Sequence, residues 1–358
     1  MKKFTALLII LSLFIIPQTG CASKSNNQGI EKTSFHLDTI CRITIYSMDG
    51  MEEKSEEEQR QDALIIITDA FKICDSYEKI LSKTIEESDV YKINHAGGQA
   101  VTVRDETIEV IKKGIEFGEK SEGAFDITIG AVSDMWDFHG QDEEGEHTGK
   151  VPEDDLLREA VSHVDYKDII IEGNTVRMAD PEAQLDLGGI AKGYIADKVA
   201  RYLEEQGVTS AIVDLGGNIV AIGEKGQSMT ESSGELFKIG IKDPSSESGQ
   251  LLGILPCRDK TVVTSGTYER YFEIDGVRYH HVLNPETGYP ADTDLLSVTV
   301  IADKGNSAYC DGLSTSCLAL GYRKAAELIK DTDGVEAIFV TKDGEVHLSA
   351  DDTGFELS

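Results

Sequence analysis

The segment at residues 185–194, Leu-Asp-Leu-Gly-Gly-Ile-Ala-Lys-Gly-Tyr, constrains the fold of this chain more than any other feature. An apolar run surrounds Asp186, two glycines follow, and Lys192 lies one turn into an amphipathic helix pattern. Glycine lets the backbone approach a ligand closely, and N–H groups at the start of a helix attract an anion. The same Asp-Leu-Gly-Gly sequence recurs at 214–217. The paired turns predict a site for a phosphorylated, metal-bound ligand.

The rest of the chain mixes helix and strand patterns without a strict βαβ alternation. Helical periodicity is found at 63–82, 89–94, 108–121, 190–206, 307–321 and 322–330. Strand patterns are found at 37–46, 169–171, 175–178, 210–213, 219–222, 236–242, 261–265, 271–274, 297–302, 337–341 and 345–348. This order predicts an α+β fold with mixed, mainly antiparallel sheets and packed helices.

The N-terminus has the pattern of a targeting segment. Lys2 and Lys3 precede an apolar run that is too short for a comfortable membrane span. The run closes at Gly20-Cys21, which resembles a bacterial lipoprotein lipobox. We therefore expect a signal peptide at 1–20, a polar tether at 21–34, and one folded unit of two lobes at 35–358. A plain signal peptide, cleaved elsewhere, is the alternative.

The charge of the chain excludes one class of partner and raises a question about another. The formal net charge is −31, so neither nucleic acid nor an anionic membrane surface is expected as a partner. An anionic cofactor would be repelled unless a metal ion and a few lysines reverse the local field. The acidic runs at 52–58 and 142–155 are interpreted as solvated surface.

The cysteines indicate neither a disulfide framework nor a structural zinc site. Five follow Cys21, an odd number, and no Cys-x-x-Cys pair occurs among them. Cys310 and Cys317 would lie about two turns apart on a helix, too far for a bridge. We expect all five to be small buried apolar residues.

The first candidate for metal binding lies near the C-terminus. On a helix, Asp311 and Thr315 share one face, so a carboxylate and a hydroxyl converge there. Two hard oxygen donors suit Mg²⁺, which completes its coordination with substrate phosphate and water. The alternative is purely structural: Asp311 caps a helix and Thr315 bonds its own backbone.

A second candidate is the segment His-His-Val-Leu-Asn-Pro-Glu-Thr-Gly-Tyr-Pro at 280–290. Its Asn-Pro and Thr-Gly steps predict a rigid turn directly after the two histidines. Histidine is the usual general base near neutral pH, although a single histidine is more often structural. The motifs of α/β hydrolases, P-loop proteins, Rossmann enzymes and zincins are absent from the sequence.

Six segments, taken in order, resemble the FAD:protein FMN transferases, the ApbE-like flavin transferase family, whose members are often lipoproteins. They are Gly-Ala-Phe-Asp at 123–126, 185–194 with Asp197, 213–218, Thr-Ser-Gly at 264–266, 281–290 and 311–315. The resemblance runs from about Phe35 to the C-terminus. It implies a T-fold-like architecture and Mg²⁺-dependent transfer of FMN from FAD to a threonine or serine of a partner protein, with release of AMP.

The resemblance also implies roles for individual residues. The Mg²⁺ ligands would be the Asp311 carboxylate, the Thr315 hydroxyl and the Gly189 carbonyl, with Asp186 in support. Lys192 and Thr287 would contact FAD, as would the segment Ala124, Phe125 and Asp126. His281 would be the base for the acceptor hydroxyl, rather than His280, because the motif is spaced from His281. The acceptor would belong to an extracytoplasmic electron-transfer system.

Two segments depart from the family pattern. The usual Met-Gly-Thr is Leu37-Asp38-Thr39 here. By this resemblance, Leu37 would keep an apolar contact for the flavin. The usual Ser-x-Tyr is Ser-Lys-Thr at 82–84, so the aromatic residue is missing. Two other functions remain open from the residues alone. One is a Mg²⁺-dependent FAD diphosphatase, and the other is a lipoprotein that binds flavin without turnover.

Overall fold

The structure is a computed structural model that describes residues 29–138, 149–225, 234–246, 248–351 and 353–358. The predicted signal peptide and Cys21 lie outside these residues, as does the first half of the acidic run at 142–155. Within the described ranges, no helix combines the length and the apolar content needed to cross a membrane.

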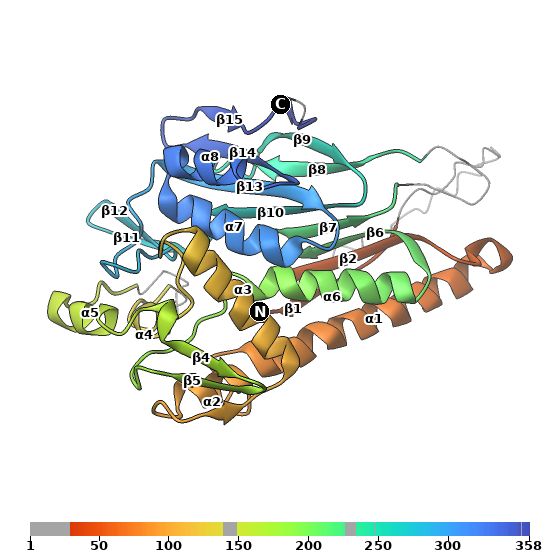
Figure 1. Cartoon of the computed structure of the whole chain (residues 1–358). Coiled ribbons are helices and arrows are strands. Elements are labelled where there is room, and N and C mark those ends of the chain that lie inside the picture. The colour runs from red at the N-terminus through yellow and green to blue at the C-terminus, as the bar shows by residue number, and fades with distance from the viewer. Residues whose placement is uncertain (1–28, 139–148, 226–233, 247, 352) are drawn as a thin grey trace, which may run out of the picture.

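An eight-stranded antiparallel sheet forms the centre of the fold (Figure 1). Its strands, in spatial order, are β1 (Ile30–His36), β2 (Thr39–Met48), β6 (Val208–Leu215), β7 (Asn218–Ile222), β10 (Lys260–Gly266), β13 (Leu295–Asp303), β14 (Val335–Thr341) and β15 (Val346–Leu348). Each pair of neighbouring strands is antiparallel. The predicted α+β class with mainly antiparallel sheets is confirmed.

Consecutive residues of the central strands enter two separate hydrophobic cores. In β10, Val262 belongs to one core and Val263 to the other, and in β14 Ile338 and Phe339 divide in the same way. Successive side chains of a strand point to opposite faces of the sheet, so these strands are buried on both faces. This double burial explains why adjacent apolar residues, Val262-Val263 and Ile338-Phe339, occur at the centres of these strands.

Helices cover one face of the large sheet (Figure 1). They are α1 (Glu56–Leu81), α6 (Ala191–Glu205), α7 (Ser307–Leu320) and α8 (Tyr322–Lys330). The helices α6 and α7 pack against each other, and α3 (Asp105–Lys120) packs against α7. The two helices that carry the predicted metal and nucleotide residues therefore lie side by side.

A small sheet covers the opposite face. It consists of β8 (Phe237–Lys242), β9 (Leu251–Cys257) and β16 (Glu356–Leu357). Phe237 and Leu255 share a core with Val262 and Ile338 of the large sheet. The large sheet is thus the middle layer of three.

The remaining elements form a second lobe beside the ends of the central strands (Figure 1). They are α2 (Asp89–Asn94), α4 (Gly130–Ser133), α5 (Asp154–Val161), the sheet β3 (Val101–Thr102), β5 (Thr175–Met178) and β4 (Ile169–Glu172), and the hairpin β11 (Tyr271–Ile274) and β12 (Val277–His280). The rings of Trp136, Phe138 and Phe272 pack together and hold the hairpin against the rest of this lobe. Two short 3-10 helices, η1 (Met51–Glu53) and η2 (Tyr166–Asp168), complete the described elements.

The acidic run near residue 55 has a local structural role. Ser55 caps α1: its hydroxyl accepts the N–H of Glu58, and the Glu58 carboxylate accepts the Ser55 N–H at 2.9 Å. Glu56 and Glu57 lie in the same first turn, where the helix dipole favours negative charge. This part of the chain is exposed, as the charge pattern predicts.

The start of the fold differs from the sequence expectation. Residues 30–34, predicted as tether, belong to β1 and pair with β2. The side chains of β1 are alternately half-buried and exposed, and Lys32 donates a hydrogen bond to Thr68 of α1. A half-buried edge strand with only one apolar residue before Phe35 lacks the alternation that identifies a strand. The strands β9 and β12 were not predicted either.

The five cysteines have the environment that the sequence predicts. All are buried and unbridged: Cys41, Cys74, Cys257, Cys310 and Cys317. Burial raises the pKa of Cys41 and Cys257 to about 11, so these thiols stay protonated at neutral pH. They act as small apolar residues of the core.

Candidate active site

A cleft of about 1200 Å³ lies where the helical layer, the large sheet and the second lobe meet. Nine of the residues singled out in the sequence line it: Leu37, Ala124, Phe125, Asp126, Asp186, Gly189, Lys192, His281 and Thr315. Asp311 is buried directly beside Lys192, so it adjoins the same cleft. Motifs spread over most of the chain are therefore brought to one place.

Asp311 is held by hydrogen bonds from two other segments. One carboxylate oxygen, Oδ2, accepts the N–H of Gly193 in α6 at 2.9 Å. The other, Oδ1, lies 3.5 Å from the Asn218 side-chain nitrogen and 3.8 Å from the Lys192 nitrogen. Asp311 is 2 % exposed, so an unpaired charge there would be costly. Within the described chain Oδ1 has only these two longer contacts, so it is the oxygen better placed to bind a cation.

The close approach of α6 and α7 depends on Gly193. A Cβ atom at this position would lie 2.2 Å from the Ser307 carbonyl oxygen and 2.8 Å from the Asp311 Cβ. Asp197 of α6 accepts the N–H groups of Ser307 and Ala308, each at 3.0 Å, at the start of α7. The two helices are thus fixed in a position that brings Asp311 to the 188–189 turn.

The oxygen donors predicted for Mg²⁺ come together with a free carbonyl among them. The Gly193 N–H, which would bond the Gly189 carbonyl in a regular helix, bonds Asp311 instead. Among the described residues no hydrogen bond reaches that carbonyl. A Cβ at Gly189 would lie 3.5 Å from the Thr315 methyl group, so the two residues are neighbours. A carboxylate, a hydroxyl and a free carbonyl are donors that fit Mg²⁺.

The Thr-Ser-Gly motif of β10 supports the same helix face. The Ser265 hydroxyl lies 2.8 Å from the Ser314 hydroxyl and 3.4 Å from the Thr315 hydroxyl. Thr315 is half-buried, whereas its helix neighbours Ser314 and Ser316 are buried. The motif therefore orients the hydroxyl that faces the cleft.

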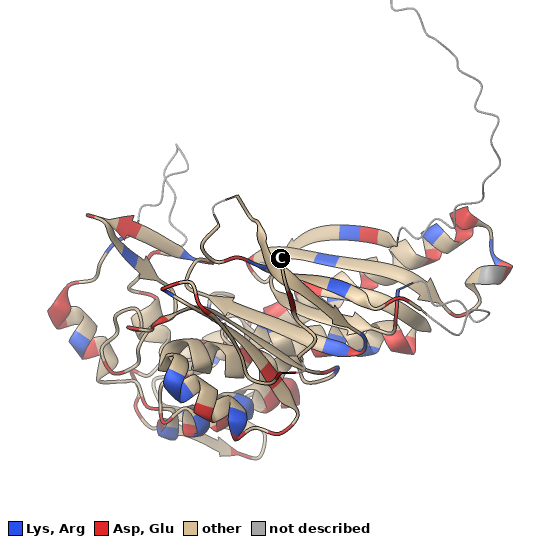
Figure 2. Cartoon of the chain, turned by 90° about the horizontal axis from the view of Figure 1, so that it is seen from above, with Lys and Arg blue, Asp and Glu red and all other residues tan. Residues whose placement is uncertain are grey.

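The balance of charge in the cleft favours binding of a cation together with a phosphate. Four basic residues line it, and six acidic ones: Lys83, Lys192, Lys242 and Arg270 against Asp38, Glu78, Asp126, Asp134, Asp186 and Glu269. Outside the cleft, Asp and Glu are spread over helices and loops with Lys and Arg among them (Figure 2). A diphosphate could enter such a cleft only with added positive charge. Lys192, whose nitrogen lies 3.3 Å from the Gly188 carbonyl, supplies part of it.

His281 is positioned as a neutral base. Its Nδ1 lies 3.2 Å from the Arg270 carbonyl oxygen, which can only accept a hydrogen bond. The proton therefore sits on Nδ1, and Nε2 keeps its lone pair. Desolvation by the surrounding walls, with Arg270 and Lys192 nearby, lowers the pKa of His281 to about 3. The imidazole of the ligand-free protein is thus neutral at physiological pH.

His280 has a different environment from its neighbour. It is 6 % exposed, does not line the cleft, and its Nδ1 has no hydrogen-bond partner. Burial, with Lys342 and Arg278 contributing, lowers its pKa to about 4. Of the two histidines, only His281 lines the cleft.

The burial of His280 makes a prediction about acid stability. An unfolded histidine titrates near pH 6.5, so between about pH 6.5 and pH 4 the unfolded chain binds one more proton than the folded one. The free energy of unfolding therefore falls as pH falls through this range. We expect His280→Gln to remove up to about 1.4 kcal/mol per pH unit from that slope. Urea unfolding across the range measures it, and parallel slopes for variant and wild type would contradict the prediction.

The other predicted residues occupy distinct positions around the site. Leu37 lies in the two-residue turn between β1 and β2, where it and Asp38 have φ of 54° and 57°. Asp126 is buried and spends both carboxylate oxygens on Thr128 and on the Tyr166 N–H, so it organises its own turn. Thr287 is exposed on the turn after His281 and does not line the cleft.

Four residues of the site were not identified from the sequence. Glu269 and Arg270 follow the Thr-Ser-Gly motif and line the cleft, and the surrounding protein raises the pKa of Glu269 to about 7. Asn218 ends the second Asp-Leu-Gly-Gly turn and reaches Asp311, which gives that turn a function. Lys83 lies in the segment that departs from the family pattern. In the sequence, each of these four residues lies within or close to a segment named above, and this proximity is the signal that points to them.

The comparisons with known sequences agree with this arrangement. The profile of the ApbE family matches residues 37–339. The chain is 33 % identical over 341 residues to the FAD:protein FMN transferase of Treponema pallidum, covering 92 % of this chain and 90 % of the relative. It is 37 % identical over 285 residues to a FAD:protein FMN transferase of Klebsiella pneumoniae, covering 78 % and 83 %.

The fold has a counterpart among solved structures. The crystal structure of the ApbE protein of Thermotoga maritima superposes with a TM-score of 0.76 and 31 % sequence identity, over 90 % of this chain and 97 % of that one. The family profile, the similar sequence from Treponema pallidum and the similar crystal structure each match most of this chain. The protein belongs to the ApbE family.

Proposed function

We propose that this protein transfers FMN from FAD to a threonine or serine hydroxyl of a partner protein and releases AMP, with Mg²⁺ as cofactor. The observation that carries the proposal is the group formed by the Asp311 carboxylate, the Thr315 hydroxyl and the unbonded Gly189 carbonyl beside Lys192. The relatives named as FAD:protein FMN transferases support the same activity.

The proposed reaction exchanges the phosphoanhydride bond of FAD for a phosphate ester bond to the acceptor. The acceptor hydroxyl oxygen attacks the FMN phosphorus, and the bond from that phosphorus to the bridging oxygen breaks, so AMP leaves with that oxygen. His281 Nε2 takes the hydroxyl proton. Lys192 stabilises negative charge on the phosphates. Mg²⁺ held by Asp311, Thr315 and Gly189 would supply further stabilisation of that charge.

The FAD diphosphatase activity is a second candidate because it needs the same residues. Thr84 lines the part of the cleft where the family pattern has an aromatic residue. A smaller side chain there leaves room for water, which would then take the place of the acceptor hydroxyl. The two activities differ only in the fate of FMN.

The proposed location is outside the cytoplasm, with a lipid on Cys21 anchoring the protein to the bacterial membrane. The apolar run before Gly20-Cys21 supports it. In that position the enzyme would meet flavin-accepting electron carriers on the same side of the membrane. Membrane fractionation of Cys21→Ser tests this. Release of the variant supports the anchor, and an unchanged distribution contradicts it.

One incubation separates the candidate functions. The folded enzyme is mixed with FAD and a flavin-accepting electron carrier, with and without Mg²⁺, and AMP, free FMN and covalently bound flavin are measured. The proposal expects AMP and bound flavin in equal amounts, only with Mg²⁺. A diphosphatase would give AMP and free FMN instead. A protein that only binds flavin would release no AMP.

A further inference from the structure

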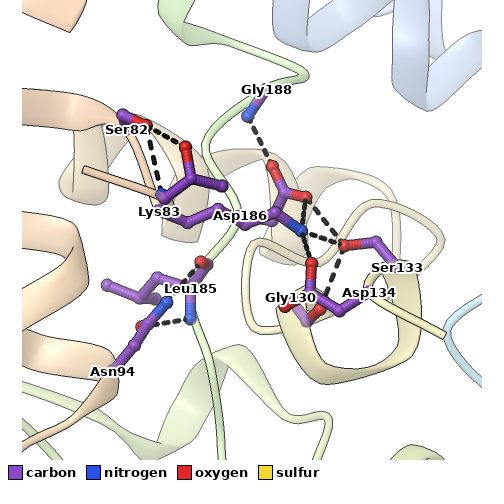
Figure 3. Close-up of polar contacts among 10 residues, drawn as sticks. Ser82, Lys83, Asn94, Gly130, Ser133, Asp134, Leu185, Asp186 and Gly188 are labelled. Carbon is purple, nitrogen blue, oxygen red and sulfur yellow. Dashed lines mark hydrogen bonds and ion pairs between the residues drawn. The ribbon is translucent and has the colours of Figure 1, made fainter. Parts of the chain in front are cut away.

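Lys83 is the central contact of a polar cluster beneath the Asp-Leu-Gly-Gly turn (Figure 3). It lies just past the C-terminal end of α1, and its side chain is 21 % exposed. Its nitrogen lies 2.6 Å from Asp134 Oδ1, 2.6 Å from the Ser133 hydroxyl and 2.9 Å from Asp186 Oδ2. Three segments that are distant along the chain thus meet at one ammonium group.

Lys83 has no hydrogen left for a substrate. An ammonium group carries three hydrogens, and the three contacts to Asp134, Ser133 and Asp186 use all of them. Burial lowers the pKa of Lys83, but the two carboxylates outweigh it and the net shift is upward, so the charge is retained. The residue therefore acts on other residues of the protein.

Asp186 transmits this contact to the metal-binding backbone. Its Oδ2 also accepts the Ser133 hydroxyl at 2.8 Å, while its Oδ1 accepts the Gly188 N–H at 2.9 Å. This second bond fixes the Leu187–Gly188 peptide, directly before Gly189 in the turn. The Gly189 carbonyl is the one left without a hydrogen bond beside Thr315.

We propose that Lys83 is a positioning residue: by holding Asp186 it fixes the 186–189 turn and so sets the affinity of the Gly189, Asp311 and Thr315 site for its divalent cation. The inference rests on the proposed function. It adds a residue that lies at the variable position of the family's Ser-x-Tyr segment, where the chain has Ser-Lys-Thr. Outer contacts of this kind typically change metal affinity about 10- to 100-fold.

The test is direct Mn²⁺ binding to the full folded protein, followed by the electron paramagnetic resonance signal of free Mn²⁺. We expect Lys83→Met to bind Mn²⁺ about tenfold more weakly than wild type, and Lys83→Arg to recover part of the loss. FAD affinity without metal should change less than about threefold, because Lys83 has no free donor. The matched control is Lys72→Met, an exposed lysine of α1 paired with Asp69, which should bind as wild type does.

The outcomes separate this inference from the proposed function. Wild-type Mn²⁺ affinity in folded Lys83→Met, with loss of binding in Asp311→Asn, would overturn the role of Lys83 alone. Unchanged binding in Asp311→Asn would overturn the metal site itself. If Lys83→Met does not fold, Lys83→Arg decides: wild-type Mn²⁺ affinity in that variant, whose planar head cannot reproduce all three contacts, contradicts the proposal.

Discussion

Asp311→Asn should lower Mg²⁺-dependent release of AMP from FAD by about 10³-fold, because it removes the only predicted ligand that carries a charge. Asparagine keeps an oxygen that can accept the Gly193 N–H, which Asp311 accepts at 2.9 Å. The helix contact between α6 and α7 should therefore survive, and the loss should be in chemistry and not in folding. The measurement is AMP release at saturating FAD over a range of Mg²⁺ concentrations.

The control for this variant is Asp303→Asn at the end of β13. Asp303 is exposed and its carboxylate pairs with Lys260, so its loss should leave AMP release unchanged. Circular dichroism and thermal unfolding check that both variants are folded. If Asp311→Asn keeps more than about a tenth of the wild-type rate, the carboxylate is not a metal ligand in the reaction.

His281→Ala should lower flavin transfer to the partner protein by about 10²- to 10⁴-fold, because it removes the base that we propose takes the hydroxyl proton. Its Nδ1 proton is held by the Arg270 carbonyl, so Nε2 is the free base. The pKa of about 3 means that the ligand-free imidazole stays neutral above about pH 4, and acidification should protonate it only below that. The measurement is the initial rate of covalent flavin incorporation.

Two comparisons identify the loss as that of a base. Imidazole added to His281→Gly should restore part of the transfer rate, which would not follow from a structural defect. His280→Gln, one residue away but buried outside the cleft, should transfer flavin at close to the wild-type rate. Equal losses in the His280 and His281 variants would mean that this segment contributes structure only.

Much of the fold follows from local patterns. Ser88, a typical helix-capping residue, caps α2 (Asp89–Asn94), and β4 and β5 pair where the strand patterns 169–171 and 175–178 lie. The strand β9 was missed because Gly253 and Pro256 interrupt its apolar pattern. The helical pattern at 108–121 places the start of α3 too late, because the helix begins at Asp105 and the Thr107 hydroxyl donates to Asp89. These misses arise where tertiary contacts replace local signals.

The candidate site, too, has a part that follows from sequence patterns and a part that depends on tertiary contacts. The pairing of Asp311 with Thr315 follows from helical spacing, and their position beside Gly189 follows from the family motifs. The contact of Lys83 with Asp134 and Asp186 joins segments far apart in sequence, so no local pattern indicates it. The raised pKa of Glu269 depends on the enclosing walls, which exist only in the folded chain.

The most direct test of the central claim is the intact mass of a flavin-accepting electron carrier after incubation with this enzyme, FAD and Mg²⁺. The account predicts that the carrier gains the mass of FMN less one water, on a threonine or serine, with one AMP released for each carrier labelled. Replacing that hydroxyl residue by alanine should abolish the gain. Release of AMP with free FMN and a carrier of unchanged mass would contradict the transfer, although the metal site would still stand.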